Sequence, residues 1–210
     1  MERENTYVGA PRREVILAKL FLSQHDRRVL ELCVKYKICK EVDAAKLPLH
    51  HGAIVLPCAD GDQMIRLFMR ILDILTKGGN PRPHWPALNG GGAILLGGGQ
   101  DLPKKYRRWG DVLFENVVDS VRAKDIETVL NLGHAPCFMA YKILNWPIER
   151  VIDCLFRGKT RIRKSIHGSN GHVTGHLHVD WGQHDELYYM DRNLWISMRS
   201  QIIAQAQQKN

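Results

Sequence analysis

Two short groups of soft metal ligands carry the chemistry that this sequence suggests. Cys58 and Asp60 stand just after one apolar run. His134 and Cys137 stand just after another. Two thiolates and an imidazole are ligands that Zn2+ prefers, and a fourth ligand completes its tetrahedron. We therefore predict a zinc site, in which Asp60 either takes the fourth position or withdraws to admit water.

The apolar runs indicate how the two groups meet. Residues 53–57 and 126–132 have the length of buried strands, and a helical pattern follows each of them. Alternating strands and helices are typical of a parallel sheet, in which strand ends share one edge. The sequence therefore predicts an α/β fold, a mainly parallel β-sheet flanked by helices, with both ligand groups at strand ends.

The ligand groups resemble the signature of the β-class carbonic anhydrases, which is Cys-x-Asp-x-Arg followed downstream by His-x-x-Cys. The first group reads CADGD from Cys58, and the second reads HAPC from His134. The stretch 121–134 resembles the family's passage from a helix end into the metal-bearing strand, and 173–180 resembles its late strand. The resemblance covers residues 50–190 and is most specific at the ligands.

The resemblance implies a function. A member of this family is a zinc-dependent lyase that reversibly hydrates carbon dioxide to bicarbonate by zinc-bound hydroxide. Carried over to this sequence, the resemblance makes Cys58, His134 and Cys137 the metal ligands. It makes Asp60 the catalytic residue, which leaves the metal to open the site. The family's N-terminal helical arm lies across a neighbouring subunit, so the resemblance also implies a homodimer or a higher homo-oligomer. An amphipathic helix that packs on its own domain is an equally adequate interpretation of this segment.

Two departures from the family pattern bear on activity. Asp62 stands where the family carries the arginine that holds the aspartate away from zinc, which leaves Asp60 able to bind the metal. The segment 90–99, GGGAILLGGG, stands where the family has a strand and a polar turn, and we expect the strand without its polar residues. An arginine elsewhere could replace the missing one, and the candidates are Arg66, Arg82, Arg107 and Arg108.

Three alternatives to an active anhydrase stay open at this point. Asp60 could close the zinc site, which would then contribute to folding and perform no chemistry. An open site could act on another small electrophile, such as carbon disulfide or carbonyl sulfide. Cys58 and Cys137 could also be core residues without a metal. The joint occurrence of these ligand types at two strand ends favours the metal.

Length and composition predict how the chain is organised. Its 210 residues with 44% hydrophobic content are enough for one domain with a substantial core. We predict an N-terminal helical arm at 1–52, a zinc-binding β-carbonic anhydrase-like α/β domain at 53–192, and a C-terminal helix at 193–210. The proline-punctuated stretch 80–86 is expected to be a loop that forms a lid or covers an edge.

The chain is basic, with a formal net charge of +8, which favours association with anions. Its clusters at 12–13, 104–108 and 157–164 lack helix-turn-helix, RNP or zinc-finger spacing. A solvated basic face is therefore favoured over a nucleic-acid groove. Five cysteines, an odd number, favour reduced thiols. Since no apolar run could span a bilayer and the N-terminus lacks a secretory pattern, we expect a cytoplasmic protein without membrane association.

The late segment 172–184 alternates in polarity. His172, Thr174, His176, His178 and Asp180 fall on one face, and mainly apolar residues fall on the other. This alternation predicts a strand with one wet side. Because alternate side chains point the same way, the histidines are also considered as a second metal site.

Overall fold

A six-stranded sheet runs through the middle of the molecule in the computed structural model, which describes residues 20–59, 61–80, 82–166 and 171–208. The strand order is β1-β6-β5-β4-β2-β3. The strands are β1 (Cys39–Glu41), β2 (Ala53–Leu56), β3 (Pro83–His84), β4 (Thr128–Ala135), β5 (His172–Asp180) and β6 (Asp185–Met190). Strands β3, β2, β4 and β5 pair in parallel, while β6 and β1 pair antiparallel. The predicted α/β class with a mainly parallel sheet is confirmed.

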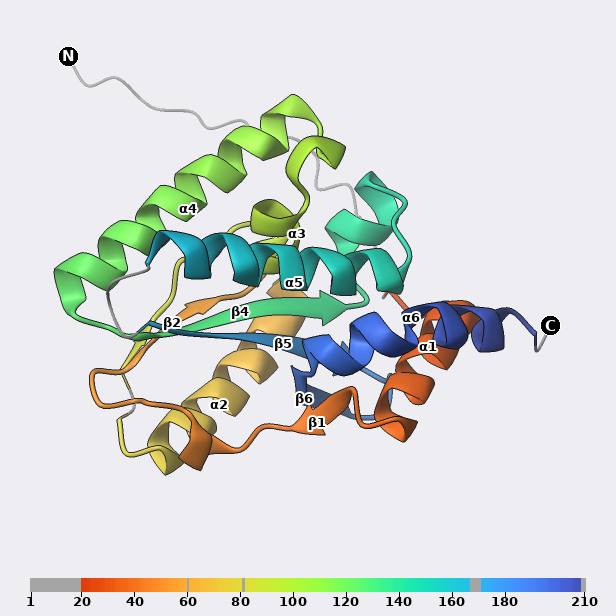
Figure 1. Ribbon diagram of the computed structural model, residues 1–210, viewed down its shortest axis with the longest axis horizontal. Coiled ribbons are helices and arrows are strands. Elements are labelled where there is room, and N and C mark those ends of the chain that lie inside the picture. The colour runs from red at the N-terminus through yellow and green to blue at the C-terminus, as the bar shows by residue number, and fades with distance from the viewer. Residues whose placement is uncertain (1–19, 60, 81, 167–170, 209–210) are drawn as a thin grey trace, which may run out of the picture.

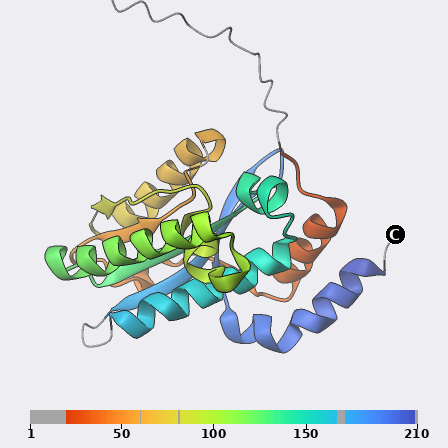
Figure 2. The same ribbon diagram turned by 90° about the horizontal axis from the view of Figure 1, so that it is seen from above.

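Helices cover both faces of this sheet (Figure 1). They are α1 (Gln24–Lys35), α2 (Gly61–Lys77), α3 (Gly91–Gly97), α4 (Lys104–Lys124), α5 (Ile148–Ser165) and α6 (Arg192–Gln207). Helix α2 lies on one face, and α3, α4 and α5 lie together on the other, which Figure 2 shows from above. No helix in the described ranges is both long and apolar enough to cross a membrane.

Alternate side chains of β2 belong to two separate hydrophobic cores. Ile54 and Leu56 pack into the larger core, under α3, α4 and α5. Ala53 and Val55 point the other way, into the smaller core against α2. Every residue of β2 and of β4 is buried, as expected for parallel strands covered on both faces. The two strands that lead to the predicted ligands are therefore the most tightly enclosed part of the sheet.

The prediction that the late strand has one solvent-exposed side is wrong. All residues of β5 from Val173 to Asp180 are buried, because β5 lies between β4 and β6 and is covered on both faces. The polar side chains on it form hydrogen bonds inside the protein. His176 Nε2 lies 2.8 Å from the Thr174 hydroxyl, and His178 Nε2 lies 3.0 Å from a carboxylate oxygen of Asp185. Polar and apolar side chains do alternate along β5, but the polar side chains face the interior of the protein.

The strand expected within 90–99 is also wrong, because residues 91–97 form the buried helix α3. Glycines allow this helix to approach its neighbours closely. A Cβ atom on Gly97 would lie 1.8 Å from the carbonyl oxygen of Cys154 in α5, and one on Gly92 would lie 2.1 Å from Oδ1 of Asn131 in β4. A short apolar run of this length has the same composition in a buried helix as in a buried strand.

The ends of the chain join the same body. Within the predicted arm, residues 1–19 lie outside the described residues, α1 packs against α6 and α5, and Cys39–Glu41 is an edge strand paired with β6. The described part of the arm is thus attached to its own sheet. In the predicted 80–86 loop, Pro83–His84 forms the two-residue edge strand β3. A proline is accommodated there because an edge strand has an unpaired side.

We predict that Gly97→Ala lowers the free energy of unfolding by about 2 kcal/mol or more, because the added methyl group meets the backbone of α5 rather than a movable side chain. Gly175→Ala is the matched control. Its Cβ would lie 3.4 Å from Leu155 in ordinary contact, so we expect a change within about 1 kcal/mol. Urea denaturation measures both, and equal losses would contradict the close approach of α3 to α5.

Candidate metal centre

The parallel pairing of β2 with β4 brings the two ligand groups to one edge of the sheet. Cys58 follows the end of β2, His134 is the penultimate residue of β4, and Cys137 follows two residues after β4. The ligand atoms of these three residues all lie within 4.8 Å of one another. Their side chains are buried, with exposures of 7%, 4% and 1%. Three of the four residues predicted from the sequence therefore form one enclosed group.

Asp60, the fourth predicted ligand and the predicted catalytic residue, lies outside the described residues. Its role as a ligand or as a withdrawing carboxylate stays a prediction. Asp62 belongs to the first turn of α2, and its side chain is also outside the description. The question of an open or a closed fourth position is therefore one for experiment.

A backbone N–H group supports the Cys58 sulfur. The amide of Gly90 donates a hydrogen bond of 3.0 Å to Cys58 Sγ. Gly90 and Gly91 have φ values of 97° and 58°, and a Cβ on Gly91 would lie 2.6 Å from the backbone nitrogen of Cys58. Only glycine combines such φ angles with so close an approach. This donor was not predicted from the sequence, although the run of three glycines was a visible signal for it.

The surroundings of Cys58 favour its neutral thiol in the absence of a cation. The hydrogen bond with Cys137 is the main cause that raises the pKa of Cys58, and burial adds to it, while His134 lowers that pKa by less. A nearby positive charge would compensate the thiolate form. A divalent metal supplies that charge. Two sulfurs and one imidazole within reach of one another match the ligand preference of zinc.

Polar side chains on β5, beside the centre, and on β6 contact one another and the half-exposed Arg66. His178 is the register partner of His134 across β4 and β5. Asp185, which bonds to His178 Nε2, also lies 3.9 Å from Nη1 of Arg66, and Asp180 lies 4.0 Å from the same nitrogen. Burial is the main cause that lowers the pKa of His178, while the hydrogen bond to Asp185 acts in the opposite direction. The sequence analysis gave Arg66 as a candidate but missed its carboxylate partners.

The second metal site considered for the late-strand histidines is not found in the described parts of the chain. The other group there with suitably close ligand atoms is His25, Asp26 and Glu149. Asp26 already has structural contacts, since it accepts a hydrogen bond from the Ser23 hydroxyl and another from the Ile148 amide. Those contacts join α1 to α5, which explains the group without a metal.

Comparisons with known proteins show a likeness to solved structures and to nothing else. Neither the protein-family models nor the curated proteins contain a match to this chain. Among solved structures, the chain is similar to the β-carbonic anhydrase isoform I of the protozoan Trichomonas vaginalis, with 12% sequence identity and a TM-score of 0.42. The match covers 77% of this chain and 93% of that one. It belongs to the family that the ligand motifs resemble, but at this TM-score the likeness does not bear on function.

We predict that Cys137→Ser removes the metal. Purified from zinc-supplemented medium, the unmodified protein should carry about one zinc per chain, and the variant should carry far less, because a serine hydroxyl is a poor ligand for zinc compared with a thiolate. Cys154→Ser is the control, since Cys154 is a buried free cysteine of α5 outside the group. Mass spectrometry of the metal content would contradict the centre if Cys137→Ser retained its zinc.

Proposed function

We propose that this protein is a zinc-dependent, β-carbonic anhydrase-like lyase that hydrates carbon dioxide reversibly to bicarbonate. The observation that carries the proposal is the convergence of Cys58, His134 and Cys137 at the ends of two adjacent parallel strands. Their order and spacing along the chain are those that resemble the family signature. The proposal includes Asp60 as the residue that either withdraws from the metal, which opens its fourth ligand position, or occupies that position.

The chain's own residues account for the binding and the enclosure. Zinc held there supplies a Lewis acid that makes a nucleophile from water near neutral pH. Cys58, His134 and Cys137 hold the metal, and the Gly90 amide orients the Cys58 sulfur by its hydrogen bond. Burial of all three side chains keeps bulk water away from the metal. A small, uncharged substrate such as carbon dioxide suits so enclosed a centre.

Two other functions use the same three ligands. A closed, purely structural zinc site is favoured by Asp62, which replaces the arginine that would hold Asp60 away. A hydrolase of carbonyl sulfide or carbon disulfide would have the same metal ligands and differ in the residues that contact the substrate. Activity measurements separate the anhydrase, the closed zinc site and the hydrolase, because only the closed site catalyses neither hydration of carbon dioxide nor hydrolysis of carbonyl sulfide or carbon disulfide.

We also propose a location and an assembly state. The five cysteines are free thiols in the structure, which agrees with a reducing compartment and supports the cytoplasm. A homodimer or higher homo-oligomer stays a prediction from the family resemblance. Helix α1 contacts α6 and α5 of its own chain.

Stopped-flow hydration of carbon dioxide tests the proposed reaction. We predict that the zinc-replete protein shows a rate that rises with pH between about 6.5 and about 9, because a zinc-bound water loses its proton in that range. Cys137→Ser should fall to the rate of the buffer, and Cys154→Ser should keep the original rate. A rate no higher than that of Cys137→Ser would contradict the proposal, and carbonyl sulfide hydrolysis by the same samples would then distinguish another substrate from a closed site.

We further predict that Asp62→Arg raises the hydration rate, by about tenfold if one charge-assisted contact to Asp60 is what limits an open metal. Asp73→Arg makes the same change of charge elsewhere on α2, at an exposed residue paired with Lys77, and should leave the rate unchanged. If both variants have the rate of the unmodified protein, the missing arginine does not limit activity.

A further inference from the structure

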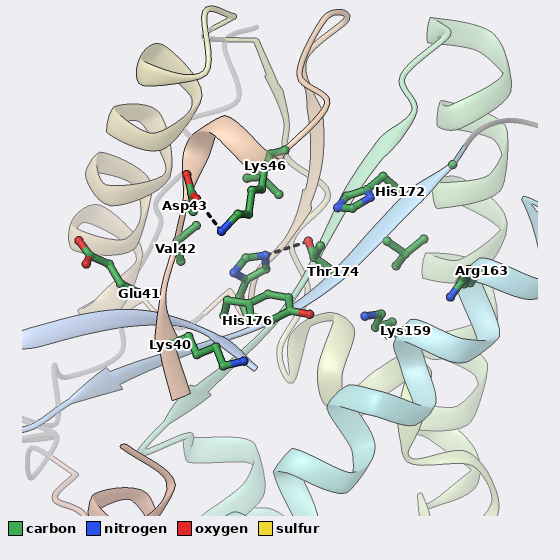
Figure 3. A pocket seen from close by; sticks show the side chains of 14 residues that line it. Lys40, Glu41, Val42, Asp43, Lys46, Lys159, Arg163, His172, Thr174 and His176 are labelled. Carbon is green, nitrogen blue, oxygen red and sulfur yellow. Dashed lines mark hydrogen bonds and ion pairs between the residues drawn. The ribbon is translucent and has the colours of Figure 1, made fainter. Parts of the chain in front are cut away.

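A second polar pocket lies at the opposite end of β5 from the candidate metal centre. Its volume is about 490 Å3, and it opens between the segment 40–47, the beginning of β5 and the later turns of α5 (Figure 3). His172, on its wall, pairs with the first residue of β4, and His134 lies six residues farther along that strand. Along the strands this places His172 about 20 Å from His134, and the nearer end of the pocket at His176 about 7 Å from it. The two share no lining residue.

The basic run 157–164 divides between two sides of α5. Arg157 and Arg161, four residues apart, form ion pairs with Asp101 and Asp111. Lys159 and Arg163, also four residues apart, line the pocket. Because 100° separates successive residues of a helix, the two pairs point to different sides. One half of the basic run is thus neutralised within the protein, and the other half is directed at a cavity.

Lys159 and Arg163 have no ion-pair partner among the described residues, and no described carboxylate forms an ion pair with the neighbouring Arg192. The carboxylates that line the pocket, Glu41 and Asp43, belong to the segment on its other side. Burial is the main cause that lowers the pKa of Lys159, and Arg163 and Arg192 lower it further. Asp191 opposes them by a smaller amount. A cation in the last turn, such as Arg163, is also favoured by the helix dipole. That effect does not explain the half-buried Lys159 among like charges, which an anion would stabilise.

The floor of the pocket offers a polar atom without a partner. His176 is fully buried, and its Nε2 atom lies 2.8 Å from the Thr174 hydroxyl. Its Nδ1 atom has no hydrogen-bond partner among the residues that the structure describes. An unsatisfied buried polar group costs free energy, and this one lies just beneath the pocket wall. Figure 3 shows His176, Thr174 and His172 between the cationic wall on α5 and the Asp43–Lys46 ion pair on the other side.

We propose that this pocket binds a small phosphomonoester, with its phosphate group held by Lys159 and Arg163 and its organic part directed toward His176 and the Asp43–Lys46 pair. Ammonium and guanidinium groups form strong, charge-assisted hydrogen bonds with phosphate oxygens. The volume is that of a site for a small organic ligand, and a free phosphate ion would fill little of it. The mixed charges of the far wall suit hydroxyl groups.

Calorimetric titration of the zinc-replete full chain tests this proposal, with inorganic phosphate and glucose 6-phosphate as separate probes at constant ionic strength. We expect glucose 6-phosphate to bind at least about tenfold more tightly than inorganic phosphate. The double variant Lys159→Gln/Arg163→Gln should weaken its binding at least about tenfold. The matched variant Arg157→Gln/Arg161→Gln removes the same charge from the same helix and should weaken it less than about threefold.

Equal weakening by the two double variants would overturn the proposal, because it would indicate attraction by the net charge alone. Absence of glucose 6-phosphate binding at millimolar concentration, or tighter binding of inorganic phosphate, would also overturn it. Loss of binding in Cys137→Ser would place the anion at the metal centre instead. Backbone amide resonances give a second readout that needs no variant: glucose 6-phosphate should shift those of 172–176 more than those of 99–111, and the reverse would contradict the site.

Discussion

The parallel pairing of β2 with β4 is the constraint on which the candidate metal centre depends. It places Leu56 beside Asn131, so the residues that follow each strand leave the sheet at the same edge. Each strand is buried on both faces, and a slip of register would exchange the residues of the two cores. The positions of Cys58, His134 and Cys137 therefore follow from packing that is much larger than the centre itself.

The position of helix α3 in this packing supports one of the ligands, Cys58. The glycines of this helix let it lie against β4 and α5, where a Cβ atom on Gly92 would overlap with Asn131 and one on Gly97 with Cys154. The amide of Gly90, at the start of the same helix, donates to the Cys58 sulfur. Stability and chemistry are coupled here, because a larger residue at 92 or 97 would move the helix and the hydrogen-bond donor together. The first half of β5 lines the basic pocket, and its second half lies beside the metal centre.

The ligand types and the sheet were predictable from the sequence, because soft ligands directly after buried apolar runs carry both signals at once. The helix at 91–97 was not, since seven buried residues show too little periodicity to separate a helix from a strand. The polar face of β5 looked solvent-exposed because partners such as Asp185 and Tyr189 come from a strand that pairs with it only in the folded chain. The carboxylate contacts of Arg66 and the Gly90 donor depend on tertiary structure in the same way.

X-ray absorption spectroscopy at the zinc edge of the purified protein tests the central claim most directly, since it counts the ligands of the metal without relying on turnover. The account predicts two sulfur ligands at about 2.3 Å, from Cys58 and Cys137, and nitrogen or oxygen ligands at about 2.0 to 2.1 Å, one of them from His134. A spectrum without sulfur, or one with four sulfur ligands, would contradict a metal centre built from these three residues.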